Sequence, residues 1–144
     1  MAISASPLVH LFDGHVYIFR AYYSVAPMEA PDGTPTNAAY GFTNQLLRHW
    51  RERQPTHMAV CFDHAMESFR NEIEPEYKAQ RDETPDDLAP QWEMCLEITR
   101  ALGIPLAEIE GYEADDIIAT LSCQARDAGG RVTIISSDKD LMQL

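Results

Sequence analysis

The sequence predicts an α/β fold with a central parallel β-sheet flanked by helices, and three observations lead to this prediction. Short runs of apolar and β-branched residues are typical of buried parallel strands. Segments with apolar residues at helical spacing separate these runs. An acidic residue stands at or just after the end of each run. Strands that alternate with helices form a parallel sheet, and such sheets bind ligands at the carboxyl ends of their strands.

The expected elements follow in order along the chain. Strands are placed at 7–12, 57–62 and 131–136, with a brief edge strand within 104–109 because Pro105 cannot donate a ladder hydrogen bond. A short helix or irregular turn is expected at 16–23, and a proline-rich loop at 26–36. Thr36 or Asn37 is predicted to cap a helix that runs to about Arg53. Two further helices are expected from Pro90 to Gly103 and from about Glu113 to Gly129.

The composition indicates a single globular domain. The chain has 144 residues, of which 45% are hydrophobic, and this is enough for one core. It contains no apolar run of about 18 residues and no signal-like start, so we expect a cytoplasmic protein without membrane association. Cys61, Cys95 and Cys123 lack Cys-x-x-Cys spacing and are expected to be buried and reduced. The net charge of −12 is only a weak argument against nucleic acid, because acids around a bound metal would not repel phosphate.

The acidic stretch 111–121 begins a predicted helix with Glu113, Asp115 and Asp116 in or near its first turn. One interpretation is that these acids complement the helix dipole, which stabilises each by roughly 0.3 to 1 kcal/mol. Their mutual repulsion opposes that gain, and crowded carboxylates that stay ionised favour a bound cation. Oxygen ligands select Mg²⁺ or Mn²⁺. Glu113 is expected just before the helix proper, where the chain can orient it independently of Asp115 and Asp116.

Acids at the other strand ends are expected to join this group. The predicted metal-site residues are Asp13, Asp63, Glu113, Asp115, Asp116, Asp138 and Asp140. Carboxylates without His or Cys partners suit two divalent ions, which activate water and stabilise the attacking and leaving oxygens of a phosphodiester. No nucleophile elbow, P-loop or Gly-x-Gly-x-x-Gly motif is present, so covalent catalysis and those modes of nucleotide binding are not supported.

The segment from His64 to about Pro90 is rich in charge and poor in apolar residues. It interleaves aromatic residues with cations at Phe69-Arg70 and at Tyr77-Lys78 followed by Arg81. A solvated loop is one interpretation, and a segment that lies near phosphates and bases is the other.

Several motifs together resemble one family. They are Leu11-Phe12-Asp13-Gly14 with Arg20-Ala21, Pro35-Thr36-Asn37-Ala38-Ala39-Tyr40-Gly41-Phe42, Phe62-Asp63, Ser68-Phe69-Arg70, Tyr77-Lys78-Ala79-Gln80-Arg81, Gly111-Tyr112-Glu113-Ala114-Asp115-Asp116 and Ser137-Asp138-Lys139-Asp140-Leu141. In this order they resemble the bacterial 5'-3' exonuclease and flap endonuclease family, which includes the N-terminal nuclease domain of DNA polymerase I.

The resemblance implies a Rossmann-like (PIN-like) sheet with a helical arch inserted at about 65–90. It implies hydrolysis of DNA or RNA strands at 5' ends, flaps and nicks with Mg²⁺ (or Mn²⁺), during replication and repair. By position it makes Arg20, Lys78 and Arg81 the cations that face the scissile phosphate. Tyr77 becomes a candidate for stacking on a base, and Phe69 and Arg70 further candidates for DNA contact.

The resemblance covers the N-terminal portion of the family, here 1–144, and implies that a helix-three-turn-helix part and further aspartates follow it in complete members. We therefore expect a fragment with reduced activity, or one half of a split nuclease whose C-terminal half another chain supplies. Two alternatives stay open. One is a PIN-type ribonuclease, and the other is a non-catalytic piece that assembles with a partner chain.

Overall fold

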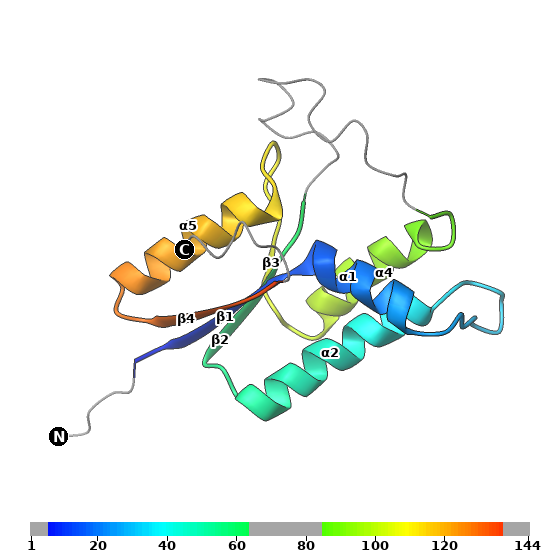
Figure 1. The fold of residues 1–144 in the computed structure, drawn as a ribbon, viewed down its shortest axis with the longest axis horizontal. Helices are drawn as coiled ribbons and strands as arrows, with labels where there is room; N and C mark the ends of the chain where they lie inside the picture. Colours follow the sequence, from blue (N-terminus) through cyan, green and yellow to red (C-terminus); the bar gives the residue numbers. More distant parts are fainter. Residues whose placement is uncertain (1–5, 64–84, 137–144) are drawn as a thin grey trace.

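The four strands form one parallel sheet, as Figure 1 shows for the computed structural model, which describes residues 6–63 and 85–136. The strand order is β3-β2-β1-β4. The strands are β1 (Leu8–Asp13), β2 (His57–Cys61), β3 (Leu106–Ala107) and β4 (Arg131–Ile135). Both neighbours of β1 run parallel to it, with Leu11 level with Ala59 on one side and with Ile134 on the other. The carboxyl ends of these strands therefore meet at one edge.

Helices cover both faces of this sheet. Their bounds are α1 (Gly14–Ser24), α2 (Asn37–Arg53), α4 (Ala89–Ala101) and α5 (Ala114–Asp127). One face packs against α5 through a cluster centred on Leu11, Ile117 and Ile118. The opposite face packs against α1, α2 and α4 through a larger cluster that contains Phe12 and Phe62. The expected three-layer α/β architecture is confirmed.

The predicted elements agree with the described ones, apart from a few residues at their ends. The segment expected as a short helix or turn is a regular helix, α1, and the edge strand is reduced to the two residues of β3. Glu113 stands one residue before α5 with extended backbone angles, as expected. Cys61 and Cys95 are buried, and burial raises the pKa of each thiol to about 12. The prediction for Cys123 is wrong, because its position on α5 is exposed. Across the described ranges, no helix has the length and apolar character that crossing a membrane requires.

The start of α2 is capped from outside the helix. Thr36 occupies the N-cap position but makes no side-chain cap, and Asn37 is the first residue of the helix, so the predicted capping by Thr36 or Asn37 is wrong. Instead Gln91 of α4, which is fully buried, accepts hydrogen bonds from the backbone N–H groups of Ala38 and Ala39 at 2.7 and 3.1 Å. Its amide nitrogen donates to Oδ1 of Asn37 and to the carbonyl of Asp87, both at 2.8 Å. Gln91 thereby satisfies donors that a helix start leaves without partners.

Asn37 extends this network to the end of α1. Its amide nitrogen donates to the carbonyls of Tyr22 and Val25, each at 3.1 Å. The hydroxyl of Tyr22 donates to Asp87 Oδ1 at 2.6 Å. The end of α1, the start of α2 and the start of α4 are thus joined by the buried side chains of Asn37 and Gln91, whose polar atoms have partners, and by the exposed bond from Tyr22 to Asp87.

A pair of histidines lies between β1 and α2. Nδ1 of His10 and Nε2 of His49 are 2.6 Å apart, and the His49 ring also packs edge-on against Phe12. Burial, and after it the charge of Arg53, lowers the pKa of His10 below 6.5. Burial also lowers the pKa of His49, with His10 and Arg53 adding to this effect and Glu52 opposing it. Both shifts favour the neutral form of the rings.

We expect the chain to lose stability as the pH falls below about 6.5, the ordinary histidine pKa, because the unfolded chain then takes up protons before the folded one does. The loss reaches at most about 1.4 kcal/mol per pH unit for each histidine and ends below the folded-state pKa values. Urea unfolding at about pH 7.5, 6.5 and 5.5 measures it, in a range above most carboxylate titrations.

The double variant His10→Leu/His49→Leu should show a much weaker dependence on pH over this range. The matched control is His57→Gln, because His57 is exposed and its ring forms a hydrogen bond with the adjacent Thr56 instead of with another histidine. The control should keep the dependence of the wild type. Equal pH dependence in the double variant and the wild type would contradict the assignment to this pair.

Candidate functional site at the strand ends

Asp13 joins the ends of β1 and β4. It is the last residue of β1 and the N-cap of α1, and it is 3% exposed. Its Oδ1 accepts a long bond of 3.4 Å from the N–H of Val16, and its Oδ2 accepts a bond of 3.0 Å from the hydroxyl of Ser136, the residue after β4. A carboxylate on the central strand is therefore fixed at the carboxyl edge of the sheet.

Asp63 joins the end of β2 to α5 and to α1. Its Oδ1 accepts a bond of 2.6 Å from the N–H of Ala114, the first residue of α5. Its Oδ2 lies 3.4 Å from Nδ1 of His15 in the first turn of α1. The acid thus satisfies one of the N–H groups at the start of α5, where a negative charge also complements the helix dipole.

The acids of α5 are arranged around the same helix start. Glu113 is the N-cap residue and is 7% exposed, while Asp115 and Asp116 are partly exposed. Oδ2 of Asp116 accepts a bond of 3.1 Å from the N–H of Glu113, and the two residues form a capping box. In a capping box each side chain satisfies a backbone donor of the first turn. Asp116 therefore stabilises the helix as well as carrying charge.

The structure brings Asp13, Asp63 and the acidic start of α5 to one edge of the sheet through these bonds. Within residues 6–63 and 85–136, however, no three His, Cys, Asp or Glu side chains are arranged so that they could hold a metal ion. Both oxygens of Asp13, Oδ1 of Asp63 and Oδ2 of Asp116 accept hydrogen bonds from helix starts or from Ser136. The remaining predicted site residues lie outside the described ones, namely Phe69, Arg70, Tyr77, Lys78, Arg81, Asp138 and Asp140.

Arg20 lies on α1, two turns beyond Asp13, and is exposed. It interacts with the hydroxyl of Tyr17, one turn earlier on the helix. Burial raises the pKa of Tyr17, and Arg20 partly opposes this effect. Tyr17 in turn packs edge-on against Phe12, at a centroid distance of 5.5 Å. Tyr17 thus connects Arg20 to Phe12 near the end of β1, and Arg20 itself lies two helical turns from Asp13.

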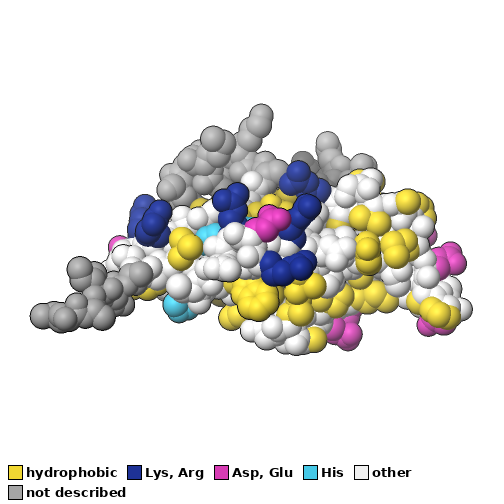
Figure 2. All heavy atoms as spheres, turned by 90° about the horizontal axis from the view of Figure 1, so that it is seen from below, with side chains coloured by type: hydrophobic (Ala, Val, Ile, Leu, Met, Phe, Trp, Pro, Cys, Tyr) yellow, Lys and Arg dark blue, Asp and Glu magenta, His cyan; other side chains and the backbone are white. Residues whose placement is uncertain are grey.

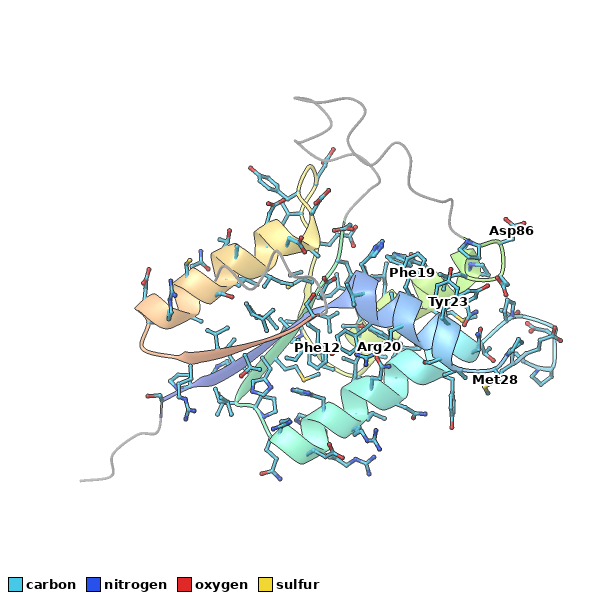
Figure 3. The ribbon with its side chains drawn as sticks, viewed as in Figure 1. Phe12, Phe19, Arg20, Tyr23, Met28 and Asp86 are labelled. Carbon is cyan, nitrogen blue, oxygen red and sulfur yellow. The ribbon has the colours of Figure 1, made fainter. Side chains whose placement is uncertain are left out.

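A row of aromatic rings runs along α1 away from the acids, and motif reasoning did not identify it. His15, Phe19 and Tyr23 follow one another at a spacing of four residues, with centroid distances of 4.9 and 6.4 Å. Trp92 of α4 packs against His15 and Phe19 at 5.1 and 6.0 Å. The row ends at Tyr23, which is 73% exposed. Figure 3 shows Phe19 and Tyr23 on the same side of α1, whereas Phe12 points into the core. The i, i+4 spacing of these aromatics was a visible signal in the sequence.

The fold and these residues define an α/β domain with a carboxylate-rich edge formed by neighbouring parallel strands. Residues 8–144 match the family described as the 5'-3' exonuclease, N-terminal resolvase-like domain, and the chain belongs to this family. The recognition from motifs is therefore confirmed.

Two relatives show how much of a complete protein the chain represents. DNA polymerase I of Rhizobium leguminosarum is 46% identical over 145 residues, which cover 94% of this chain and 14% of that protein. The 5'-3' exonuclease of Aquifex aeolicus is 39% identical over 136 residues, which cover 94% of this chain and 47% of that protein. The chain thus spans less than half the length of either relative.

Solved structures support the fold. T5 5'-exonuclease with bound zinc has a TM-score of 0.67 at 23% identity, covering 93% of this chain and 50% of that one. The T5 flap endonuclease in a complex with DNA and metal ions has a TM-score of 0.64 at 23% identity, covering 94% and 51%. Human GEN1 in complex with Holliday junction DNA has a TM-score of 0.56 at 16% identity, covering 96% and 34%. At these identities the likeness concerns the fold.

We expect Asp116→Ala to lower the free energy of unfolding by about 1 kcal/mol without metal, because it removes one half of the capping box. Urea unfolding in the presence of a chelator measures this change. Glu110→Ala is the matched control, since Glu110 is an exposed acid in the turn before α5 and its removal changes the net charge equally. A variant at Asp116 as stable as the control would show that the capping contact is not formed in solution.

Proposed function

We propose that the protein containing this chain is a divalent-metal-dependent 5' nuclease that hydrolyses phosphodiester bonds of DNA at 5' ends, flaps and nicks. One observation carries the proposal: Asp13 and Asp63, from adjacent parallel strands, are held at one edge of the sheet together with the acidic start of α5. Membership of the 5'-3' exonuclease family supports the reaction.

The residues at this edge fit a divalent ion by their chemistry. Asp13, Asp63, Glu113, Asp115 and Asp116 offer only carboxylate oxygens, the ligand type that Mg²⁺ and Mn²⁺ prefer. The protein already holds Asp13 and Asp63 with hydrogen bonds, as supporting donors do for metal-binding carboxylates. We infer that these five acids, with Asp138 and Asp140, would hold two ions in the complete enzyme. The T5 exonuclease structures with metal ions are consistent with this inference.

A bound divalent ion would lower the pKa of water and offset the charge that develops on a phosphodiester. The protein residues supply positioning. Arg20, two helical turns into α1, is suited to bind a phosphate oxygen, and we infer the same role for Lys78 and Arg81. Phe19 and Tyr23 present ring faces or edges along α1 that can stack on unpaired bases, and we assign a similar role to Tyr77, with Phe69 and Arg70 as further DNA contacts.

We propose that the chain contributes most of the acids but cleaves weakly without the polypeptide that follows in longer relatives. The relatives are at least twice as long as the matched region, so other parts of the complete protein can contribute ligands and DNA contacts. A cytoplasmic location fits a DNA substrate. The arch at about 65–90 remains an inference from the family, because residues 64–84 lie outside the described part.

We expect Asp13→Asn and Asp63→Asn each to weaken Mn²⁺ binding by at least tenfold and to lower the cleavage rate of a 5'-flap DNA by about 10²-fold or more. Asparagine keeps one acceptor oxygen for the backbone N–H of Val16 or Ala114, and at position 13 its NH2 group can donate to the Ser136 hydroxyl, so the charge is removed while the fold should persist. Calorimetric Mn²⁺ titration and single-turnover cleavage, on a protein that includes the whole nuclease region, measure the two effects.

Asp32→Asn is the matched control, because Asp32 lies in the loop between α1 and α2 and accepts a bond from the N–H of Thr34. It should leave metal affinity and cleavage unchanged. Wild-type metal affinity in both site variants would remove the proposed metal site. Faster cleavage of RNA than of flap DNA would instead favour a PIN-type ribonuclease, and metal binding without any cleavage would favour an assembly role.

A further inference from the structure

A cationic face surrounds the C-terminal half of α2, although the chain carries a net charge of −12. The face consists of Arg48, Arg51 and Arg53 of α2, Arg20 of α1 and Arg131 of β4, all exposed. Among the residues that the structure describes, only Arg100 and Arg126 carry a positive charge elsewhere. Figure 2, which views the molecule from the side of α2, shows dark blue side chains gathered around a central acidic one.

Independent contacts place these arginines on one side of the sheet. Arg53 is close enough to His10 of β1 to lower its pKa, and Arg20 contacts Tyr17, which packs on Phe12 of β1. Val132 and Ile134 of β4 pack toward α5, so the alternation of a strand directs Arg131 to the opposite face, the one that α2 covers. Arg20, Arg53 and Arg131 thus lie on the side of the sheet that α2 covers, and Arg48 and Arg51 are exposed on α2 itself.

The surface between them is hollowed and polar. A hollow of about 640 Å³ is lined, among the described residues, by Asn44, Gln45, Arg48, Arg51 and Glu52. The side-chain oxygen of Gln45 is buried there and has no hydrogen-bond partner in the described part of the chain. A groove of about 380 Å³ elsewhere along α2 differs in character, since Leu46, Leu47, Trp50 and Ile104 are among its lining residues. The two surfaces of α2 therefore suit different contacts.

We propose that this cationic face binds the phosphate backbone of the duplex part of a DNA substrate, with Arg20 nearest the acidic strand ends and Arg48, Arg51 and Arg53 farther from them. The inference rests on the proposed function, because it takes the substrate to be nucleic acid. Guanidinium groups bind phosphate oxygens through paired N–H donors, and backbone contacts of this kind position a duplex without reading its sequence.

The spacing of Arg48 and Arg51 allows both long side chains to reach phosphates of one strand. Arg48 and Arg51 are one turn apart, which is roughly 4.5 Å along the helix axis, and the phosphates of one strand advance roughly 3.4 Å each along the duplex axis. Arg48 contacts Glu52 at 3.5 Å, with both side chains largely exposed. An exposed pair of this kind contributes little, so Arg48 can exchange Glu52 for a phosphate at small cost.

The residues that line the hollow favour duplex DNA over a single strand or a protein surface. Proteins that hold single strands present aromatic rings among their cations, and the lining of this hollow contains no aromatic side chain among the described residues. The aromatic row of α1 is a separate feature, next to Asp63 and Trp92. A surface that packs against the rest of its own polypeptide would present apolar residues at its centre, and this lining contains none in the described part.

The test compares Arg48→Gln/Arg51→Gln with the wild type in a protein that includes the whole nuclease region. Fluorescence anisotropy measures the dissociation constant of a blunt duplex of about 20 base pairs between roughly 50 and 200 mM KCl. Each lost phosphate contact lowers the slope of log K against log salt by about 1, so the double variant should lose about 2. Arg126→Gln is the matched control, since Arg126 is an exposed arginine on α5, across the sheet, and should keep the wild-type slope.

Three outcomes would overturn the inference. The first is a salt slope equal to that of the control. The second is an equal loss of slope on a single strand of the same length, which would contradict the assignment to a duplex. The third is an unchanged slope together with a lower Tm, which would assign the face to packing within the protein.

Two further readouts keep these results interpretable. Arg48→Lys/Arg51→Lys retains the charge and should restore most of the slope, even if the glutamine variant folds poorly. Single-turnover flap cleavage in the wild type separates the two proposals. If the wild type cleaves and the double variant keeps its salt slope, only the proposal for the cationic face is refuted. If the wild type neither binds nor cleaves DNA, the proposed function is refuted.

Discussion

The hydrogen bond from the N–H of Ala114 to the carboxylate of Asp63 is the contact on which the candidate site depends. It fixes the start of α5 at the end of β2, although α4 and β3 lie between them in the sequence. Asp63 satisfies a donor that the helix cannot satisfy itself, and its charge complements the helix dipole. The same position gathers Glu113, Asp115 and Asp116 beside Asp63, so the fold itself concentrates negative charge there. A cation bound among these carboxylates would reduce the electrostatic repulsion between them.

Helix α1 connects this edge to the rest of the domain. His15, in its first turn, lies against Asp63, and Tyr22, two turns later, donates to Asp87. The seven residues between these contacts correspond to roughly 10 Å along a helix. The described ranges end at Asp63 and resume at Pro85, and α1 thus contacts residues beside both points. Gln91 and Asn37 secure the second point, because their amides link α4 to the ends of α1 and α2.

Patterns of local origin predicted most of the fold and part of the site. The apolar runs specified β1, β2 and β4, and the strand-end position of Asp13 and Asp63 followed from the parallel sheet. The extended backbone of Glu113 followed from the crowding of acids at a helix start. Contacts between distant residues were not accessible in this way. Gln91 caps α2 across 53 residues of sequence, and a glutamine within an amphipathic helix has no local feature that indicates this role. Likewise, Arg53 and Arg131 lie on the same side of the molecule only because α2 packs against the sheet that contains β4, and the sequence alone does not show this packing.

If the substrate is DNA, as proposed, the distribution of charge explains how an acidic chain would contact it. Exposed charges are screened over about 8 Å at physiological ionic strength, so a phosphate responds to nearby side chains more than to the net charge of −12. Here the charges are separated in space. Acids are concentrated at the carboxyl ends of the strands, where a cation would neutralise them, and arginines are concentrated around α2. A polyanion that approaches α2 first encounters Arg48, Arg51 and Arg53, and can reach the acidic edge after its backbone is held. Net charge therefore describes the solubility of this chain better than it describes the ligands that its individual faces accept.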